Sequence, residues 1–203
     1  MNDRQDFQPA RVLVTGFGPF GKNASNPTSE LVRTLQEKPI PGVVAQVLPV
    51  EFVAGPARLR ELIDRYRPEL VLCTGLAAGS TALRVERIAV NERAGRDEAG
   101  IEGAVNGRRT RLEDSAESPD GRFATLDTDA LLGCLRSGGL AAEESWHAGT
   151  FVCNAVLWEA ITAGIPAGFL HVPADVDVPT LVEALSGFFG AAGIDAVGQT
   201  SGQ

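Results

Sequence analysis

Arg11-Val-Leu-Val-Thr15 and Leu70-Val-Leu-Cys-Thr74 are two short, nearly continuous apolar runs. Such runs are typical of strands that helices cover on both faces. Further short β-branched runs predict strands at residues 43–50, 84–91 and 168–172. Helical patterns alternate with these strands, at residues 27–37, 53–67, 127–137, 151–163 and 178–192.

This alternation predicts an α/β protein: a single-domain three-layer α/β/α sandwich with a twisted, mostly parallel central sheet. A chain of 203 residues suits one domain, so we expect residues 1–203 to form it, with about 1–9 and 196–203 flexible. Residues 106–121 are polar and flanked by glycines, which predicts an exposed hairpin or loop outside the sandwich.

Composition narrows the classes of partner. A formal charge of −8 argues against the clustered basic surplus that phosphate binding needs, so we expect no nucleic-acid partner and favour a small neutral or peptide-like ligand. No apolar run reaches the roughly 20 residues that span a bilayer, and residues 1–10 lack the apolar segment of a signal peptide. We therefore expect a cytoplasmic protein with no membrane partner. Three cysteines without a CxxC pair suggest neither a disulfide framework nor a metal site.

The segment Ala148-Gly-Thr-Phe-Val-Cys153 places a cysteine at the opening of a predicted amphipathic helix. The positive end of the helix dipole favours the reactive thiolate, so Cys153 is a candidate nucleophile, although a cysteine here could also be a small buried hydrophobe. Cys73 and Cys134 lie inside apolar runs and are interpreted as core residues.

A thiolate nucleophile generally needs a base and an acid to orient that base. His171 lies at the end of a predicted strand, where open α/β sheets place their ligand crevice, whereas His147 lies in a polar turn typical of an exposed histidine. Glu86 is a carboxylate inside a strand-like run, which is costly to bury unless it is paired. It could equally be an edge-strand charge paired with Arg84 or Arg87.

A glycine-rich loop offers an alternative function. Gly16, Gly18 and Gly21 satisfy the GxGxxG spacing directly after a strand, as in dinucleotide-binding enzymes. Pro19 and residues 22–25 separate these glycines from the helix, however, whereas the dinucleotide motif runs straight into a helix that holds the pyrophosphate. The same loop could present phenylalanines as the walls of a small pocket.

Five stretches together resemble the pyroglutamyl peptidase I family of cysteine peptidases, also called pyrrolidone-carboxylate peptidases. They are VLVTGFGPFG at 12–21, NPTSELV at 26–32, VERIAVN at 85–91, AGTFVCN at 148–154 and GFLHVP at 168–173. The resemblance implies that Cys153 is the nucleophile, His171 the general base and Glu86 the acid that orients His171. It also implies a homotetramer and a reaction without cofactor or metal.

The resemblance also assigns a substrate pocket. Phe17, Phe20, Phe151 and Val152 would hold the pyroglutamyl ring, and Asn26 would order that pocket. Arg96 falls where the family has an arginine close to the reacting carbonyl, a partner for developing negative charge.

Four departures from the family concern loops and not the proposed catalytic residues. Gly18 stands where the family usually has Asp, Lys22 where it has Gly, and His147 where it has Thr. The stretch after Arg96, residues 97–100, is about two residues shorter than usual. We expect a cysteine peptidase that removes N-terminal pyroglutamate from peptides through a thioester. The alternatives are a catalytically silent pyroglutamate-binding protein of the same fold and the nucleotide-binding enzyme.

Overall fold

The computed structural model describes residues 11–22 and 24–193, so the predicted flexible ends, 1–9 and 196–203, lie outside the described residues. In chain order the elements are β1 (Val12–Phe17), α1 (Pro27–Glu37), β2 (Val43–Leu48), α2 (Ala54–Tyr66), β3 (Leu70–Leu76), β4 (Leu83–Glu86), β5 (Ile88–Val90), β6 (Ala104–Val105), β7 (Arg108–Arg109), β8 (Gly121–Phe123), α3 (Thr128–Ser137), β9 (Ala142–Ser145), α4 (Val152–Thr162), β10 (Ala167–Val172) and α5 (Val178–Ala191). Among the described residues, no helix is long and apolar enough to cross a membrane.

Six strands form the central sheet in the order β2-β1-β3-β10-β4-β9. All neighbouring strands are parallel except β10 and β4, which run antiparallel. The middle strands β1, β3 and β10 are buried along their whole length, as the continuous apolar runs predict. The predicted mostly parallel sheet is thereby confirmed.

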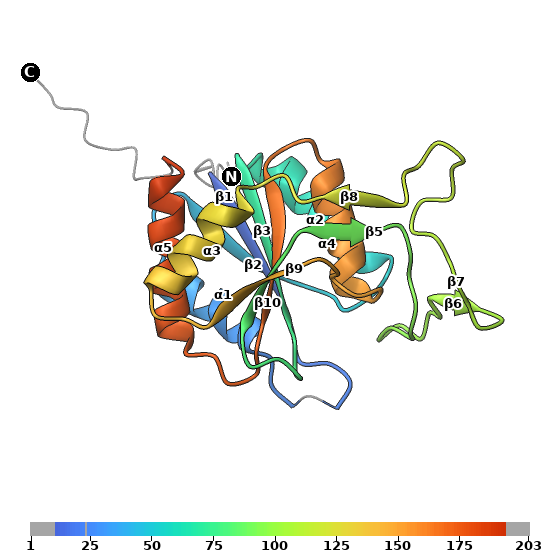
Figure 1. Ribbon diagram of the computed structural model, residues 1–203, viewed down its shortest axis with the longest axis horizontal. Coiled ribbons are helices and arrows are strands. Elements are labelled where there is room, and N and C mark those ends of the chain that lie inside the picture. The colour runs from blue at the N-terminus through green and yellow to red at the C-terminus, as the bar shows by residue number, and fades with distance from the viewer. Residues whose placement is uncertain (1–10, 23, 194–203) are drawn as a thin grey trace, which may run out of the picture.

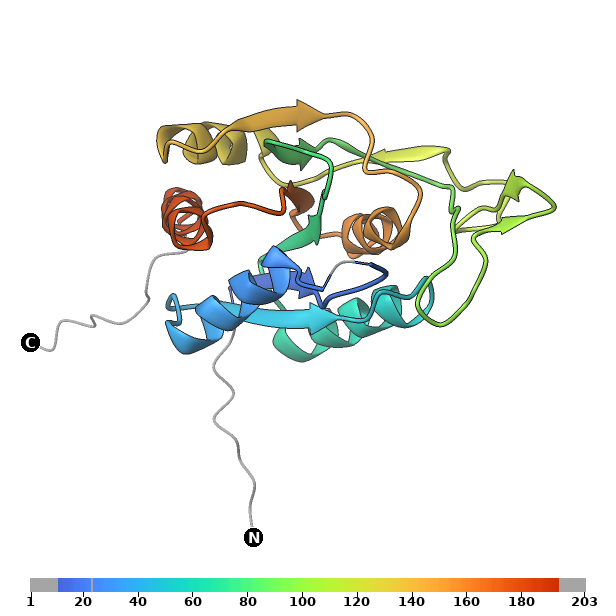
Figure 2. The same ribbon diagram turned by 90° about the horizontal axis from the view of Figure 1, so that it is seen from below.

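Helices cover both faces of this sheet and complete the three-layer sandwich (Figures 1 and 2). On one face α1, α3 and α5 pack together, and their apolar side chains form one core cluster with the sheet. On the other face α2 packs against α4 and encloses a second cluster. This second cluster contains Cys73 and borders Cys153, so the sheet face beneath α4 positions the candidate site.

The strand predicted at 84–91 is wrong as one element, because it divides at Arg87 into β4 and β5. β4 belongs to the central sheet, whereas β5 and β8 form a separate two-stranded sheet. The strand β9 was not predicted, because its Ala-Glu-Glu-Ser sequence has little apolar character. Such a sequence suffices there because, among the strands of the described residues, β9 lies at the edge of the sheet and pairs with β4 on one side.

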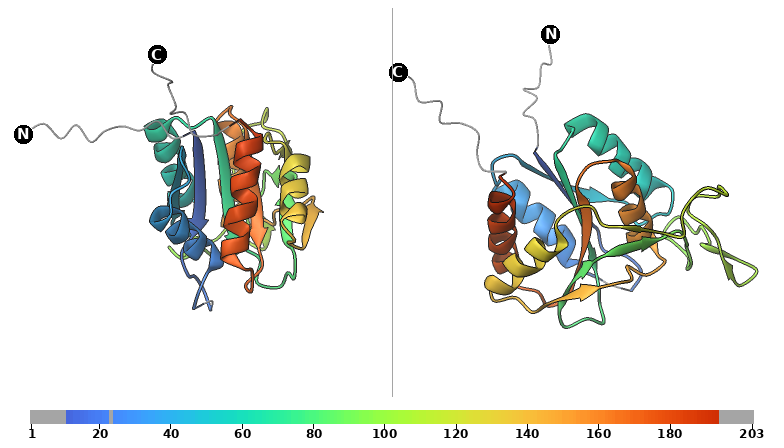
Figure 3. Two further views of the ribbon diagram at one scale, coloured as in Figure 1. Left: turned by 90° about the vertical axis from the view of Figure 1, so that its left-hand side faces the viewer. Right: turned by 45° about the horizontal axis from the view of Figure 1, so that its top comes forward.

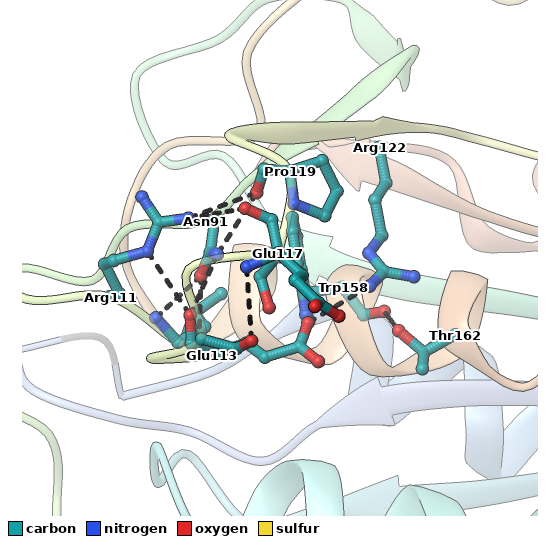
Figure 4. Close-up of polar contacts among 11 residues, drawn as sticks. Asn91, Arg111, Glu113, Glu117, Pro119, Arg122, Trp158 and Thr162 are labelled. Carbon is teal, nitrogen blue, oxygen red and sulfur yellow. Dashed lines mark hydrogen bonds and ion pairs between the residues drawn. The ribbon is translucent and has the colours of Figure 1, made fainter.

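Residues 91–121 leave the sandwich as an excursion that projects beyond α4 (Figures 1 and 3). It contains the small hairpin of β6 and β7, which confirms the predicted polar hairpin, although this hairpin begins before residue 106. Asn91, 1% exposed, holds the base of the excursion (Figure 4). Its amide donates to the carbonyl oxygens of Glu113 and Pro119 and accepts from the backbone N–H groups of Leu112 and Glu113.

Candidate active site

Cys153 is the second residue of α4, and its side chain faces the sheet at β3. A Cβ atom at Gly75 would lie only 2.8 Å from the Cys153 Sγ, so the sulfur occupies the space that a side chain on β3 would fill. The helix begins after a turn with Gly149 at φ +81°, and Phe151 provides no side-chain cap. The thiol is therefore held at a helix N-terminus whose first amides are not capped by a side chain.

His171 lies on β10, directly opposite Gly75 on β3 in the strand register. Its side chain lies close enough to Cys153 for the thiol to raise the pKa of the imidazole, and its Nδ1 lies 2.8 Å from Oε1 of Glu86. Glu86 is opposite Phe169 on the antiparallel strand β4, so it reaches His171 along the diagonal of the same sheet face. Three residues that are far apart in the sequence thus form one continuous chain of contacts.

Glu86 is fully buried, and its Oε2 has no hydrogen-bond partner among the described residues. Its negative charge is therefore balanced chiefly through the imidazole. Burial alone would lower the pKa of His171, but hydrogen bonds and charge interactions with Cys153 and Glu86 outweigh it and raise the pKa to about 9. This environment favours an imidazolium next to the sulfur at neutral pH.

An aromatic cluster lies beside the N-terminus of α4. The ring of Phe151 packs edge-on against Phe52 at 5.4 Å and lies 6.3 Å from the ring of Phe20. Phe20 and Phe151 are half-buried, so they present an apolar surface next to Cys153. Phe52 was not singled out in the sequence, because nothing local connects residue 52 with residue 151.

Comparison with known proteins identifies the family. The family model described as pyroglutamyl peptidase matches residues 10–183. The chain belongs to the pyroglutamyl peptidase family.

Relatives and solved structures agree with this assignment. The chain is 38% identical to the pyrrolidone-carboxylate peptidase of Pseudomonas fluorescens, over 80% of this chain and 78% of that protein. It is 40% identical to the pyrrolidone-carboxylate peptidase of Chromobacterium violaceum, over 80% of this chain and 77% of that protein. The structure resembles pyroglutamyl peptidase I of Bacillus amyloliquefaciens, with a TM-score of 0.78, 26% identity and 92% and 98% of the two chains covered. It also resembles the pyrrolidone carboxyl peptidase of Thermococcus litoralis, with a TM-score of 0.77 and 27% identity, over 92% of this chain and 97% of that chain.

The other residues that the family resemblance places in a pocket lie at different depths. Phe17 is 2% exposed and belongs to the core beneath the site, and Val152 is fully buried and packs toward Gly55 of α2. Asn26 is 2% exposed and caps α1 by accepting from the Thr28 N–H, which confirms the predicted helix start. Its amide also donates to the Gly18 carbonyl oxygen and so ties down the glycine-rich loop.

Arg96 is the most exposed of the predicted site residues. Its side chain is 70% exposed, and its guanidinium lies 3.8 Å from the carboxylate of Glu102. The neighbouring Asp97 is buried and accepts from the backbone N–H groups of Phe52 and Ile101, which fixes the shortened loop against the aromatic cluster. A role for Arg96 at the reacting carbonyl stays a prediction.

Two residues that shape the site could not be recognised from the local sequence. One is Gly75, which lies opposite His171 in the strand register and, because it has no side chain, leaves room for the Cys153 sulfur. The other is the fully buried Asn154, whose side chain bonds both backbone polar groups of Val90 and the carbonyl of Glu92. It fastens the start of α4 to β5. Its signal in the sequence was a polar residue in the first turn of a largely apolar helix.

The remaining cysteines and the second histidine lie as expected or nearly so. Cys73 is fully buried, and this burial raises the pKa of its thiol to about 12, which keeps it protonated. Cys134 is half-buried against the other core cluster, less enclosed than predicted. His147 is exposed, and its Nδ1 accepts from the Gly149 N–H.

The glycine-rich loop does not take the form of a dinucleotide site. A Cβ at Gly16 would lie 2.5 Å from the Thr28 carbonyl oxygen, so this glycine permits close packing of β1 against α1. The Thr28 N–H already bonds to Asn26, and this amide is not available to a pyrophosphate. Among the residues with described structure, no group of three or more His, Cys, Asp or Glu side chains is arranged to hold a metal ion.

Proposed function

We propose that this chain removes N-terminal pyroglutamate from peptides, with Cys153 as nucleophile, His171 as acid and base, and Glu86 as the group that orients and charges His171. The observation that carries the proposal is the continuous contact from Cys153 through His171 to the buried Glu86. A nucleophile that contacts a base, which in turn contacts an orienting acid, is the arrangement that acyl-transfer enzymes use.

In the first half of the reaction the Cys153 thiolate attacks the carbonyl carbon that joins pyroglutamate to the next residue. In this proposal the amide groups at the N-terminus of α4, which no side chain caps, donate hydrogen bonds to the resulting oxyanion. His171 then gives its proton to the leaving nitrogen, the C–N bond breaks, and a thioester remains on the sulfur.

In the second half His171, now neutral, takes a proton from water as the water oxygen attacks the thioester carbon. The C–S bond breaks, free pyroglutamate departs, and the thiolate and imidazolium are restored. Glu86 keeps the imidazole in one orientation throughout, since its Oε1 holds Nδ1 and leaves Nε2 to exchange protons.

Recognition of the pyroglutamyl ring uses the aromatic cluster of Phe20, Phe52 and Phe151. Pyroglutamate is a lactam with no free amine, so its ring is selected by apolar contact and shape. The half-buried rings of Phe20 and Phe151 supply that surface beside the sulfur, with Phe17 and Val152 supporting it from the core.

The test is release of the fluorophore from pyroglutamyl-aminomethylcoumarin by the reduced protein, with Cys153→Ser, His171→Ala and His147→Ala alongside. We expect loss of turnover in the first two variants, by about 10³-fold or more, and little change in the third. Circular dichroism checks that each variant is folded. No hydrolysis by the folded wild-type protein, combined with binding of free pyroglutamate, would instead identify a silent binding protein.

A cytoplasmic location and a homotetramer complete the proposal. Cys73, Cys134 and Cys153 are all free, and a catalytic thiolate is preserved best in a reducing compartment. Light scattering measures the mass of the assembly directly, and a monomer at micromolar concentration would contradict the tetramer.

A further inference from the structure

A cleft of about 610 Å³ opens beside the candidate catalytic histidine. Its walls are the turn of residues 77–81 after β3, Arg84 on β4, Glu143 on β9, residues 147–149 before α4, and His171 itself. The cleft is therefore continuous with the reacting groups, and yet none of its other walls has a part in the proposed chemistry.

The strand register gives the cleft a direction. Gly75, His171, Arg84 and Glu143 are successive partners across β3, β10, β4 and β9, so they form one row on the sheet face that carries His171. The row leads from the catalytic histidine toward the sheet edge at β9. The aromatic cluster lies on the other side, because Phe20 and Phe52 follow β1 and β2 at the opposite end of the strand order.

This arrangement separates the two halves of a substrate. If the pyroglutamyl ring lies on the aromatic cluster and its carbonyl lies at Cys153, the leaving peptide extends away from the ring, toward β9. His171, which protonates the leaving nitrogen, lines the cleft that lies in that direction. The volume falls within the about 300–1,000 Å³ of pockets that enclose a small ligand, which is room for roughly two or three residues.

The lining of the cleft indicates what it selects. Ala77, Ala78 and Gly79 have little or no side chain, so bulky groups fit beside them. Arg84 and Glu143 face each other with Nε and Oε1 3.6 Å apart, and their opposite charges largely offset. His147 uses Nδ1 to accept from Gly149, which leaves Nε2–H as a donor for a peptide carbonyl.

We propose that this cleft binds the leaving peptide, and that the preferred substrates are pyroglutamyl peptides with at least two residues after pyroglutamate, whatever the charge of those residues. The inference rests on the proposed function. It adds a substrate class to that function and assigns a specificity-determining role to residues 77–81, Arg84, Glu143 and His147.

The experiment compares kcat/KM for pyroglutamyl-alanine and for the same compound extended by one, two and three alanines. We expect at least a tenfold rise over the first two additions and then a plateau. Replacing the second alanine by Lys or by Glu should alter kcat/KM by less than about threefold. A flat length series would overturn the cleft assignment, and so would a large preference for one charge.

A blocking variant locates the effect. A Cβ at Gly79 meets no atom within 4 Å, so Gly79→Trp fits the backbone and fills the cleft; Gly133→Trp, at an equally open position on α3, is the matched control. We expect Gly79→Trp to reduce the rise of kcat/KM with peptide length at least fivefold, whereas Gly133→Trp should show the same rise as the wild type. An unchanged gain in folded Gly79→Trp would exclude this cleft.

Pyroglutamyl-aminomethylcoumarin separates the two proposals. Its hydrolysis without any gain from peptide length would overturn the cleft assignment and leave the proposed function intact. If the folded protein hydrolysed neither the fluorogenic compound nor any peptide, the proposed function would fail, and the inference with it.

Discussion

Glu86 shows at the scale of one residue how burial directs chemistry. Its carboxylate is fully buried and contacts His171, so its charge stabilises the imidazolium form. Replacing this carboxylate by a neutral amide removes that stabilisation, so the pKa of His171 must fall from about 9. In the proposed thiolate–imidazolium enzyme, activity declines as the imidazolium loses its proton.

For Glu86→Gln we therefore expect the alkaline limb of kcat/KM to move from about pH 9 to lower pH, by about one unit or more. The measurement is the pH profile on pyroglutamyl-aminomethylcoumarin. Glu37→Gln, at an exposed position paired with Arg33, is the control and should keep the wild-type profile. An alkaline limb that stays near pH 9 in Glu86→Gln would contradict the assigned role.

Gly75 is a positioning residue whose contribution is the absence of a side chain. A methyl group at this position would lie 2.8 Å from the Cys153 Sγ and 2.7 Å from Cζ of Phe169, so the sulfur or the ring must move. We expect Gly75→Ala to lower kcat/KM by about 100-fold or more, because small displacements of reacting atoms are costly, and to destabilise the fold by about 1–3 kcal/mol.

The rate of Cys153 alkylation by iodoacetamide distinguishes misplacement from unfolding. We expect a changed rate in folded Gly75→Ala and an unchanged one in Gly133→Ala, where the added methyl meets no atom within 4 Å. Wild-type turnover in Gly75→Ala would show that the sulfur tolerates the displacement.

At the scale of elements, the excursion of residues 91–121 depends on one buried side chain. Asn91 makes four hydrogen bonds to backbone groups of the excursion, and Ala could make none of them. We expect Asn91→Ala to lower the free energy of unfolding by about 1–3 kcal/mol and to speed proteolytic cleavage within residues 106–121. Limited trypsin digestion, read by mass spectrometry, checks this, and the exposed Asp114→Ala should behave as wild type. Equal cleavage rates in the two variants would show that other contacts hold the excursion.

For the molecule as a whole, the pair of His171 and Glu86 links stability to pH. The folded-state pKa of His171 is about 9, above its ordinary value of 6.5. The stabilisation is therefore fully present below about pH 6.5 and is lost as the pH rises through about 9. Urea unfolding should show that the free energy of unfolding of the wild type decreases from pH 6.5 to pH 9.5, and that it decreases less in His171→Gln. The same decrease in both proteins would place the linkage elsewhere.

Local sequence determined most of the architecture. The predicted helix at 27–37 coincides with α1, because Asn26 and Pro27 are a helix start that needs no tertiary partner. The apolar runs of β1 and β3 likewise identify central strands, since only burial on both faces accounts for them. The split of the strand at Arg87 and the polar edge strand β9 depended instead on pairing partners that adjoin them only in the folded chain.

The same division applies to the site. Cys153 could be chosen as a candidate nucleophile from its place at a helix start, and His171 as a candidate base from its place at a strand end, because both are local features. Their contact with Glu86 was inferred from family resemblance, since sequence separation carries no distance. The space at Gly75, the contact of Phe52 with Phe151 and the row from His171 to Glu143 were decided by tertiary structure alone. The physical reason is that strand register and helix packing, which the sequence specifies only collectively, set which side chains meet.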